Sequence, residues 1–244
     1  MILDVRAVGP FYKNGFVAAC ERTREAVVID PGDEAAALLD AVRGHELRVR
    51  HILLTHAHVD HITGVGIVKD ACGAPVYLHA DDLPFYEHAV EQGQMFGLAV
   101  RKLPPVDVFY AKALIAFGDY EVRVHHTPGH CPGGVCLEIQ GSGPRAQQGS
   151  GLRAQGSREK HLFVGDTLFA GSIGRTDLPG GDYEVLMRSI TGVLFPLGDE
   201  AIVHPGHGPD TTLGRERTTN PFVLEYFALK STKTDQNRFP NSRA

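Results

Sequence analysis

Short apolar runs separated by turn residues alternate with longer amphipathic stretches along most of the chain. Apolar runs bounded by Gly, Pro and Asn predict strands, and apolar residues spaced three or four positions apart predict helices. Strands that alternate with helices are typical of a layered α/β fold. The runs predicted as strands are Ile2–Val8, Phe16–Cys20, Ala26–Ile29, Val49–Leu54, Val76–His79, Tyr120–His126, Gly134–Ile139, Leu162–Val164 and Ala201–His204.

Helical patterns occupy three of the stretches between these strands. After Asp33, a residue type that caps helix N-termini, the apolar residues Ala36, Leu39 and Val42 share one stripe of a helix. Gly44 then stands where a left-handed C-terminal cap is expected. The other two helices are predicted over Val65–Ala71 and Tyr183–Thr191.

Two segments are too polar to contribute to a core. Residues 141–157 repeat Gly-Ser-Gly-x-Arg-Ala-Gln with a period of eight, from Gly141 and again from Gly149, and predict an expanded hairpin loop. Because the strands on either side of it run in opposite directions, we expect this loop at the end of the sheet remote from His130. Residues 230–244 are expected to form a loose polar tail, which leaves one folded domain over residues 1–229.

Composition narrows the class of protein further. The chain has 244 residues, with 24 Lys and Arg against 29 Asp and Glu, so it lacks the basic excess on which nucleic-acid binding depends. No segment approaches the roughly 18 consecutive apolar residues of a membrane span, and Met1–Arg6 lacks the basic start of a signal peptide, so we expect a cytoplasmic protein. Four scattered cysteines do not suggest a disulfide framework. Histidine stands out, at 13 residues.

Four potential metal ligands lie within six residues at the end of one predicted strand. The run His56-x-His58-x-Asp60-His61 follows Val49–Leu54 directly. Neutral imidazole and carboxylate groups are good ligands for zinc or iron. One ion cannot easily use all four, whereas His56 and His58 can face one ion while Asp60 and His61, beyond the bend, face a second. Two ions predict further ligands downstream.

Three later strands are each followed by such a residue. Thr127-Pro-Gly-His130, Gly165-Asp166-Thr167 and Pro205-Gly-His207-Gly208 all stand just beyond an apolar run. Residues delivered from several strand ends converge at one edge of a sheet, where α/β folds commonly place their active sites. The four motifs together predict a metal site.

In this order the motifs resemble the metallo-β-lactamase superfamily. The resemblance spans roughly Ile2 to Phe227. It implies a four-layer αβ/βα sandwich, with the metals at the mouth between two sheets, and a hydrolase domain over residues 1–229. The ligand assignment that it implies is His56, His58 and His130 for one ion, Asp60, His61 and His207 for the other, and Asp166 as the bridge.

Within the superfamily, Gly165–Asp177 and Pro205–Thr212 are similar to the short bacterial glyoxalase II type, or hydroxyacylglutathione hydrolases. Those enzymes hydrolyse a small-molecule thioester such as lactoylglutathione to a hydroxy acid and a free thiol. The stretch after His207 is too short for the helical domain that holds glutathione in the larger glyoxalase II enzymes. The resemblance therefore implies a thioester, possibly glutathione-derived, as substrate.

The implied cofactors are two divalent ions, zinc first, with iron or manganese as alternatives. Such a pair generates a hydroxide that can attack the thioester carbon, and Asp60 is the candidate for orienting it. Arg175 is a candidate clamp for a substrate carboxylate, or else an ion-pair partner of Asp177. Phe11 and Tyr12 are candidate walls of the pocket.

Two further residues stand close to the ligands in the sequence or at the same predicted sheet edge. Asp30 is a candidate acceptor for the second N–H of a metal-bound imidazole, or else a turn residue before Pro31. Cys131 follows His130, and we interpret it as a small residue in a tight turn rather than a nucleophile, because a metal-bound His130 is no base.

Two alternative activities remain open. A persulfide dioxygenase, a relative with a single iron bound by two His and one Asp, also carries the Gly174–Asp177 motif. His207 in Pro-Gly-His-Gly argues against it, because those enzymes typically lack this last motif. A lactonase or β-lactamase would use the same two metals on a different bond.

Overall fold

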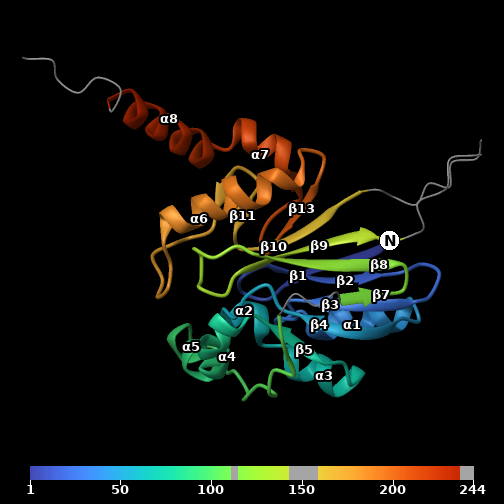
Figure 1. Ribbon diagram of the computed structural model, residues 1–244. Coiled ribbons are helices and arrows are strands. Elements are labelled where there is room, and N and C mark those ends of the chain that lie inside the picture. Colours follow the sequence, from blue (N-terminus) through green and yellow to red (C-terminus); the bar gives the residue numbers. More distant parts are fainter. Residues whose placement is uncertain (111–114, 143–158, 237–244) are drawn as a thin grey trace, which may run out of the picture.

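A computed structural model describes residues 1–110, 115–142 and 159–236. Two six-stranded sheets face each other, and helices cover the outer face of each, as Figure 1 shows with α1 to α5 below and α6 to α8 above. The layers are therefore helix, sheet, sheet and helix. This arrangement confirms the predicted four-layer α/β sandwich.

The first sheet has the strand order β1-β2-β3-β4-β5-β6. Its first three strands form an antiparallel meander, and β4, β5 and β6 continue the sheet parallel to β3. Parallel neighbouring strands end at the same edge of a sheet, so the residues that follow β3, β4 and β5 lie close together at that edge. The strands are β1 (Ile2–Val8), β2 (Lys13–Ala19), β3 (Glu25–Ile29), β4 (Arg48–Leu53), β5 (Val76–Leu78) and β6 (Val108–Phe109). The helices are α1 (Ala35–Gly44), α2 (Val59–Ile62), α3 (Val65–Cys72), the 3-10 turn η1 (Ala80–Asp82), α4 (Leu83–Glu87) and α5 (Ala89–Met95).

The second sheet has the order β14-β13-β10-β9-β8-β7, with only β10 and β13 parallel. Its strands are β7 (Ile115–Phe117), β8 (Tyr120–His126), β9 (Val135–Gly141), β10 (His161–Gly165), β13 (Ile202–Pro205) and β14 (Thr211–Thr212), and a separate hairpin joins β11 (Leu168–Phe169) to β12 (Ser172–Ile173). Its helices are α6 (Tyr183–Ser189), the π-helical turn η2 (Ile190–Leu194), the 3-10 turn η3 (Phe195–Leu197), α7 (Leu213–Thr219) and α8 (Pro221–Gln236).

Alternation along the central strands explains why three apolar layers form. Successive side chains of a strand point to opposite faces of its sheet. In β2, Val17 packs against the helices of the first half, whereas Phe16 packs between the two sheets against Phe163 of β10. Leu162 faces the other way and packs against the helices of the second half. Each buried side chain of this size stabilises the fold by about 1.5–3 kcal/mol.

Buried polar residues account for the differences at the ends of two predicted elements, β2 and α1. Helices α4, α5, α7 and α8 and several short strands were not predicted from the sequence. Strand β2 begins at Lys13, three residues before the predicted Phe16, although Lys13 and Asn14 are polar, because both are buried in tertiary contacts. Helix α1 has Glu34 at its N-cap position and not Asp33. The Glu34 carboxylate instead accepts hydrogen bonds from the Gly32 N–H and from Lys13. The left-handed residue after α1 is Glu46 and not Gly44, which remains helical.

The predicted tail and insertion lie at the margins of the described residues. Helix α8 continues to Gln236, so the prediction of a loose tail from residue 230 is wrong for 230–236, and Lys230 pairs with Glu184 of α6. Of the predicted insertion 141–157, residues 143–157 lie outside the described residues. The flanking strand ends, Gly141 and His161, lie at the opposite end of the sheet from His130 and Asp166.

Candidate metal centre

All seven predicted ligands meet at one mouth between the two sheets. The first sheet provides four of them, from the loop after β4 and the short helix α2. The second sheet provides the others from the β8–β9 turn and from the residues just after β10 and β13. A Cβ at Gly206 would lie 2.3 Å from Oδ1 of Asp166 and 2.7 Å from the His61 ring, so only glycine lets the β13 loop approach this closely.

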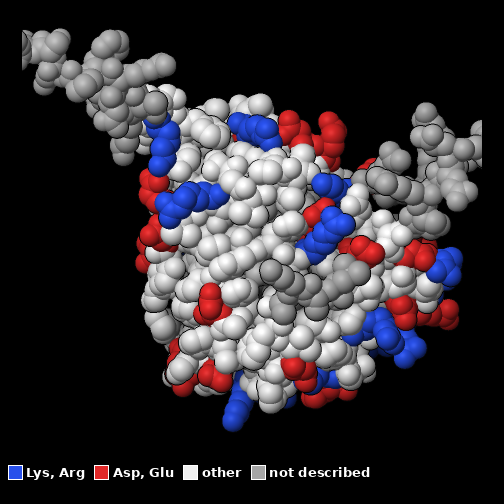
Figure 2. All heavy atoms as spheres, in the orientation of Figure 1, with Lys and Arg blue, Asp and Glu red and all other residues white. Residues whose placement is uncertain are grey.

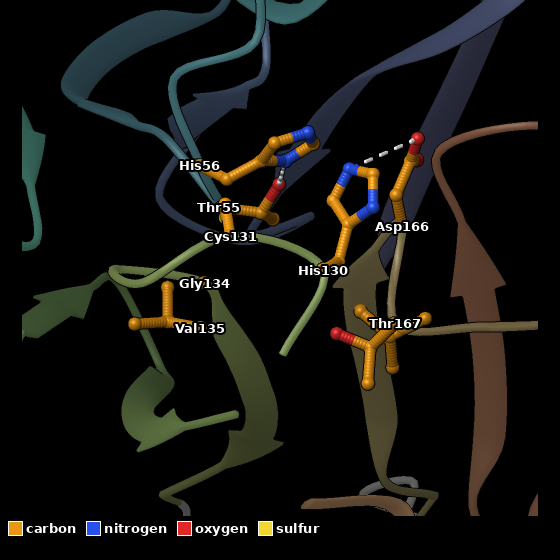
Figure 3. Close-up of a pocket in the computed structure, with 9 residues that line it drawn as sticks. Thr55, His56, His130, Cys131, Gly134, Val135, Asp166 and Thr167 are labelled. Atoms are coloured by element: carbon orange, nitrogen blue, oxygen red, sulfur yellow. Dashed lines mark hydrogen bonds and ion pairs between the residues drawn. The ribbon is translucent and has the colours of Figure 1, made fainter. Parts of the chain in front are cut away.

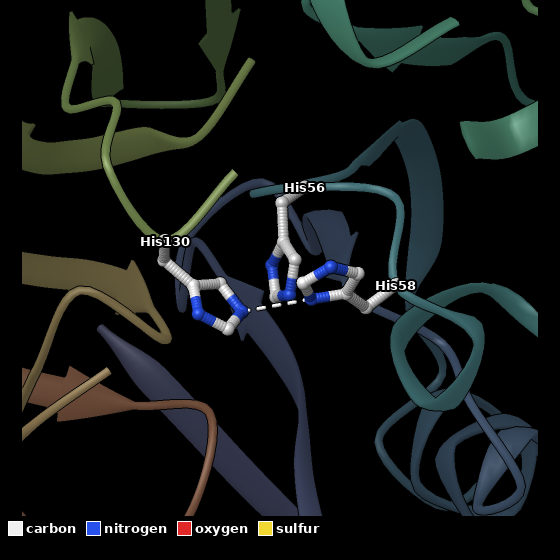
Figure 4. Close-up of side chains that lie close together, drawn as sticks. All are labelled: His56, His58 and His130. Carbon is white, nitrogen blue, oxygen red and sulfur yellow. Dashed lines mark hydrogen bonds between the residues drawn. The ribbon is translucent and has the colours of Figure 1, made fainter. Parts of the chain in front are cut away.

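Three histidines form the first ligand group, shown in Figure 4. Nδ1 of His58 lies 2.8 Å from Nε2 of His130. The His56 ring is nearly perpendicular to both, with centroid distances of 4.9 Å to His58 and 5.0 Å to His130. One nitrogen from each ring lies within 4.8 Å of the others, a spacing at which one ion can contact all three.

The second ligand group consists of Asp60, His61 and His207. Oδ2 of Asp60 lies 3.2 Å from Nε2 of His207 and 3.7 Å from Nε2 of His61. These ligand atoms also lie within 4.8 Å of one another. The run after β4 thus contributes side chains to both groups, and His56 and His61 lie close together across the division, with ring centroids 4.0 Å apart.

Asp166 lies between the two groups. Its Oδ2 is 3.7 Å from Nε2 of His130, a contact drawn in Figure 3, and 3.5 Å from Nε2 of His207. Its Oδ1 is 3.4 Å from Nε2 of His61. A carboxylate that reaches ligands of both groups is placed to bridge two ions.

Unpartnered polar atoms show that the residues fit metal ions. Among the described residues, Nε2 of His56, Nε2 of His61 and Oδ1 of Asp166 are buried at this centre without a hydrogen-bond partner. Buried polar atoms in native proteins are normally paired, and an unpaired one costs free energy. A pair of divalent cations would satisfy all three atoms at once.

The electrostatics of the first group favour the form that binds metal. Burial and the neighbouring imidazoles lower the pKa of His56 well below its usual value and that of His58 to about 4. Burial would raise the pKa of Asp166, but His61 and other imidazoles outweigh it and lower that pKa. Neutral imidazoles and an ionised carboxylate are the species that coordinate zinc or iron.

His61 behaves differently from the first group. Burial alone would lower its pKa, but the carboxylates of Asp60 and Asp166 outweigh burial and raise the pKa of His61 to about 10. Without an ion, the proton on His61 is therefore the positive charge that those carboxylates hold. A divalent cation would replace this proton, because a ligating imidazole must be neutral.

In four of the five imidazoles, Nδ1, the ring nitrogen remote from the centre, makes a hydrogen bond that fixes the orientation of the ring. Nδ1 of His61 donates to Oδ2 of Asp30 at 2.9 Å, and Asp30 also accepts from the N–H and the hydroxyl of Thr55. Because the Thr55 hydroxyl donates its proton to Asp30, its oxygen can only accept from His56. Nδ1 of His56 therefore donates to Thr55 Oγ1 at 3.1 Å. Nδ1 of His130 donates to the carbonyl of residue 175, and Nδ1 of His207 to that of residue 11. Each of these rings thus turns Nε2 toward the centre.

Two of the three predicted substrate contacts, Arg175 and Phe11, border the centre through their backbone carbonyls, but their side chains contact other residues. The Arg175 guanidinium makes a bidentate ion pair with Asp177, at 2.7 and 2.8 Å. An ion pair with Asp177 was the predicted alternative to a substrate contact. The Phe11 ring packs edge-on against Phe96, with ring centroids 5.9 Å apart. Tyr12 is 73% exposed.

Cys131 is buried, and its thiol donates to Oδ2 of Asp82 at 3.3 Å. Burial raises the pKa of Cys131 well above its usual value. A protonated, buried thiol is a poor nucleophile, in agreement with the interpretation of Cys131 as a turn residue.

Sequence patterns missed two kinds of residue at the centre. Asn14 of β2 donates to the carbonyls of Pro205 and Gly208, at 3.0 and 2.8 Å, and so holds the loop that carries His207. Phe85 and Phe169 place their rings 6.0 Å from His58 and 6.2 Å from His207. No local motif marks these residues, because they reach the centre only through tertiary packing.

A further cluster of His79, Asp81 and His126 lies apart from the centre. The two imidazoles stack with centroids 4.2 Å apart and planes only 11° from parallel. Metal bonds lie in the plane of an imidazole, so two parallel rings do not direct their lone pairs at one point. This arrangement is a stacking contact rather than a second metal centre.

The rest of the described molecule adds two observations. None of its helices has the length and apolar character needed to cross a bilayer. On the face shown in Figure 2, the described Lys and Arg side chains are interspersed with Asp and Glu and do not gather into a basic patch.

Comparisons with known proteins agree with this geometry. Residues 8–143 match the family model described as the metallo-beta-lactamase superfamily. The hydroxyacylglutathione hydrolase GloC of Haemophilus influenzae is 34% identical over 82% of this chain and 88% of that protein. The crystal structures of the BLEG-1 B3 metallo-beta-lactamase (36% identity, TM-score 0.77, 91% of this chain and 99% of that one) and of TTHA1623 in a di-iron-bound form (40% identity, TM-score 0.74, 90% and 99%) are similar throughout. With a matching family model, a relative that is 34% identical over most of both chains, and a matching fold, the chain belongs to the metallo-beta-lactamase superfamily of metal-dependent hydrolases.

Proposed function

We propose that this protein is a dinuclear metal hydrolase that cleaves a thioester of the hydroxyacylglutathione type. The observation that carries the proposal is the completeness of the second ligand group, in which His207 joins Asp60 and His61. The similarity to the hydroxyacylglutathione hydrolase GloC supports the choice of a thioester. The di-iron form of TTHA1623 supports two ions.

Two divalent ions, when bound, would lower the pKa of a water molecule and polarise the substrate carbonyl. His56, His58 and His130 would hold one ion, Asp60, His61 and His207 the other, and Asp166 would contact both. Zinc is the first choice, with iron and manganese as alternatives for the same ligands.

Asp60 is the proposed catalytic carboxylate. Burial opposes its ionisation, but His61 and His207 outweigh burial and lower the pKa of Asp60, so it is ionised at neutral pH. Its Oδ2 faces the nitrogens of both histidines at the mouth. An ionised carboxylate there can accept a hydrogen bond from the attacking water and fix its orientation.

The substrate would enter between aromatic side chains. Phe85 lies beside His58 and Phe169 beside His207, and Phe11 with Phe96 forms a further apolar contact near the His207 loop. We propose that Phe11 and Tyr12 line this entrance. Arg175 could turn from Asp177 to a substrate carboxylate at little cost, because both partners of that ion pair are exposed.

Two other activities would use parts of the same centre. Hydrolysis of a β-lactam or lactone needs the same ligands, and the similarity to the BLEG-1 B3 metallo-beta-lactamase favours it as the second candidate. A mononuclear iron persulfide dioxygenase activity agrees with the Gly174–Asp177 motif. It needs only one ion, however, so it does not explain why Asp60, His61 and His207 form a second group.

Metal analysis followed by a substrate panel tests the proposal. We expect two equivalents of metal per chain and hydrolysis of lactoylglutathione in preference to a lactone or a cephalosporin. Asp60→Asn should lower kcat by about 100-fold or more, in the range of general acid–base contributions. Fewer than two equivalents of metal with no thioester cleavage would overturn the proposal. Oxygen consumption with glutathione persulfide would establish the dioxygenase instead.

A further inference from the structure

A second buried carboxylate, Asp82, stands beside the loop that carries the first ligands. It ends the 3-10 turn after β5 and is fully buried. Strands β3, β4 and β5 are parallel neighbours, with β4 in the middle. Asp30 follows β3 and Asp82 follows β5, so the ligand loop after β4 lies between two carboxylates from its neighbours.

The two carboxylates accept hydrogen bonds from different backbone N–H groups of this loop. Oδ1 of Asp30 accepts from the backbone N–H of Thr55 at 2.6 Å. Oδ2 of Asp82 accepts from the backbone N–H of Ala57, between His56 and His58, at 2.9 Å. Asp30 also contacts an imidazole of the second ligand group directly, through His61. Asp82 contacts the first group only through the chain that carries it.

Asp82 also reaches the segment that carries the third histidine of the first group. Its Oδ1 accepts from the N–H of Gly133 at 2.6 Å, and its Oδ2 accepts from the thiol of Cys131, the residue after His130. A Cβ at residue 133 would lie 2.6 Å from the Asp82 backbone nitrogen, so this approach requires glycine. The conformation of the β8–β9 turn therefore depends on its contact with Asp82.

These two segments come from opposite sheets. The Ala57 loop follows β4 of the first sheet, and the turn at 130–133 joins two strands of the second. The same carboxylate holds both, so it fixes the distance between His56 and His58 on one side and His130 on the other. That distance determines whether three imidazole nitrogens converge on one point.

We infer that Asp82 is a positioning residue for the first ligand group, which sets the affinity of the three-histidine ion site without touching an ion or substrate. The inference rests on the ligand assignment in the proposed function and is independent of which bond the enzyme cleaves. It predicts selectivity, because a residue that merely supported the fold would affect both groups alike.

Zinc titration of two single-site backgrounds tests this inference. His207→Ala removes a ligand of the second group and isolates the first, whereas His58→Ala isolates the second. Adding Asp82→Asn should weaken zinc binding about 10- to 100-fold in the His207→Ala background, the usual effect of losing an outer partner of a metal site. It should leave the affinity in the His58→Ala background unchanged.

The matched control is Asp81→Asn, which makes the same change of charge one residue earlier. Asp81 is exposed, and it should alter neither affinity. Thermal unfolding of each variant checks that the protein is folded. If Asp82→Asn does not fold, Cys131→Ala removes one of the three contacts and should weaken only the three-histidine site, by about threefold.

Unchanged affinity of the three-histidine site would overturn the inference, and so would an equal loss at both sites in folded protein. Absence of zinc binding in both parent backgrounds would contradict the ligand assignment itself. Normal zinc binding without thioester cleavage would contradict only the proposed reaction.

Discussion

Nδ1 of His61 donates to Oδ2 of Asp30 across 2.9 Å, and both side chains are almost completely buried. The other nitrogen of His61 faces Asp60 and Asp166. The imidazole is therefore fixed between a carboxylate behind it and two in front of it, and its orientation depends on Asp30.

Asp30→Asn should weaken zinc binding to the second ligand group about 10- to 100-fold. An amide cannot accept hydrogen bonds in all the positions where the carboxylate accepts from His61 and Thr55. Asn suits this position otherwise, since Asp30 has a positive φ of 48° that Asn tolerates better than most residues. Zinc titration in the His58→Ala background measures the effect, with exposed Asp33→Asn as control. Equal affinity in Asp30→Asn would contradict the role assigned to Asp30.

Chelation should destabilise the folded protein. The unpartnered atoms of His56, His61 and Asp166 lose their cation on metal removal, and free zinc at 100 times its dissociation constant stabilises the fold by about 2.7 kcal/mol per site. In a chain of this size that corresponds to a fall in Tm of roughly 5–10 °C per site. Differential scanning calorimetry with a chelator, and again after zinc is restored, measures the change. A Tm insensitive to both treatments would show that the centre binds no ion.

Lys13→Met should be strongly destabilising. Lys13 and Glu34 are each 1% exposed and form an ion pair, and the Lys13 ammonium also donates to the carbonyl of Asp30. Removing one member of a buried pair leaves an uncompensated charge, at about 3–5 kcal/mol. Urea denaturation measures the free energy of unfolding.

The double variant Lys13→Met with Glu34→Gln should recover a large part of that loss, because no buried charge remains. Lys69→Met, which breaks the more exposed pair with Asp107, should cost about 1 kcal/mol or less. A loss for Lys13→Met no larger than this control would show that the buried pair contributes little.

Glu138→Gln should lower stability at neutral pH but not in acid. Nε2 of His125 donates to Oε2 of Glu138 at 2.7 Å, and this hydrogen bond lowers the pKa of the buried Glu138 below 4.5. A depressed pKa means that the ionised form contributes stability fully above about pH 4.5, and that the contribution is lost as pH falls through the folded-state pKa. The difference in unfolding free energy between the two proteins should therefore shrink as the pH falls below about 4.5. A constant difference across this range would contradict the assignment.

Deletion of residues 141–157, with Gln140 joined to the chain after residue 157 by a short turn, should leave kcat/KM nearly unchanged. The end of β9 lies roughly 20 Å from its start near the ligands, at about 3.3 Å per residue. Steady-state kinetics on the substrate that the panel identifies, with metal content and Tm as controls, measures the effect. A large loss of activity in a folded, metal-loaded variant would show that this segment reaches the mouth.

Much of the fold could be predicted because its strands are marked locally. β1 and β8 have the predicted bounds, Ile2–Val8 and Tyr120–His126, since apolar runs and turn residues delimit them. The ligands could be predicted for the same reason, because each follows a recognisable strand. Residues whose role depends on distant partners could not. Asn14 contacts a loop 191 residues away, and Asp82 holds a turn about 50 residues away.

Polar residues that the structure buries were the main source of error at element ends. Lys13 lies outside the predicted strand, which begins at Phe16, but in the structure it is a strand residue paired with Glu34. Glu34 in turn accounts for the wrong cap at Asp33. The choice between substrate and Asp177 for Arg175 could not be made from the sequence, because both alternatives need the same exposed guanidinium.

The division of ligands between two sheets has a consequence for biosynthesis. The first ligand is residue 56 and the last is residue 207, and His58 meets His130 only when the two halves face each other. A chain growing on the ribosome therefore cannot complete the first ligand group before residue 130, or the second before residue 207. Metal loading of the second group is therefore expected to follow synthesis of most of the chain, and a cell starved of the ion would accumulate finished chains without it.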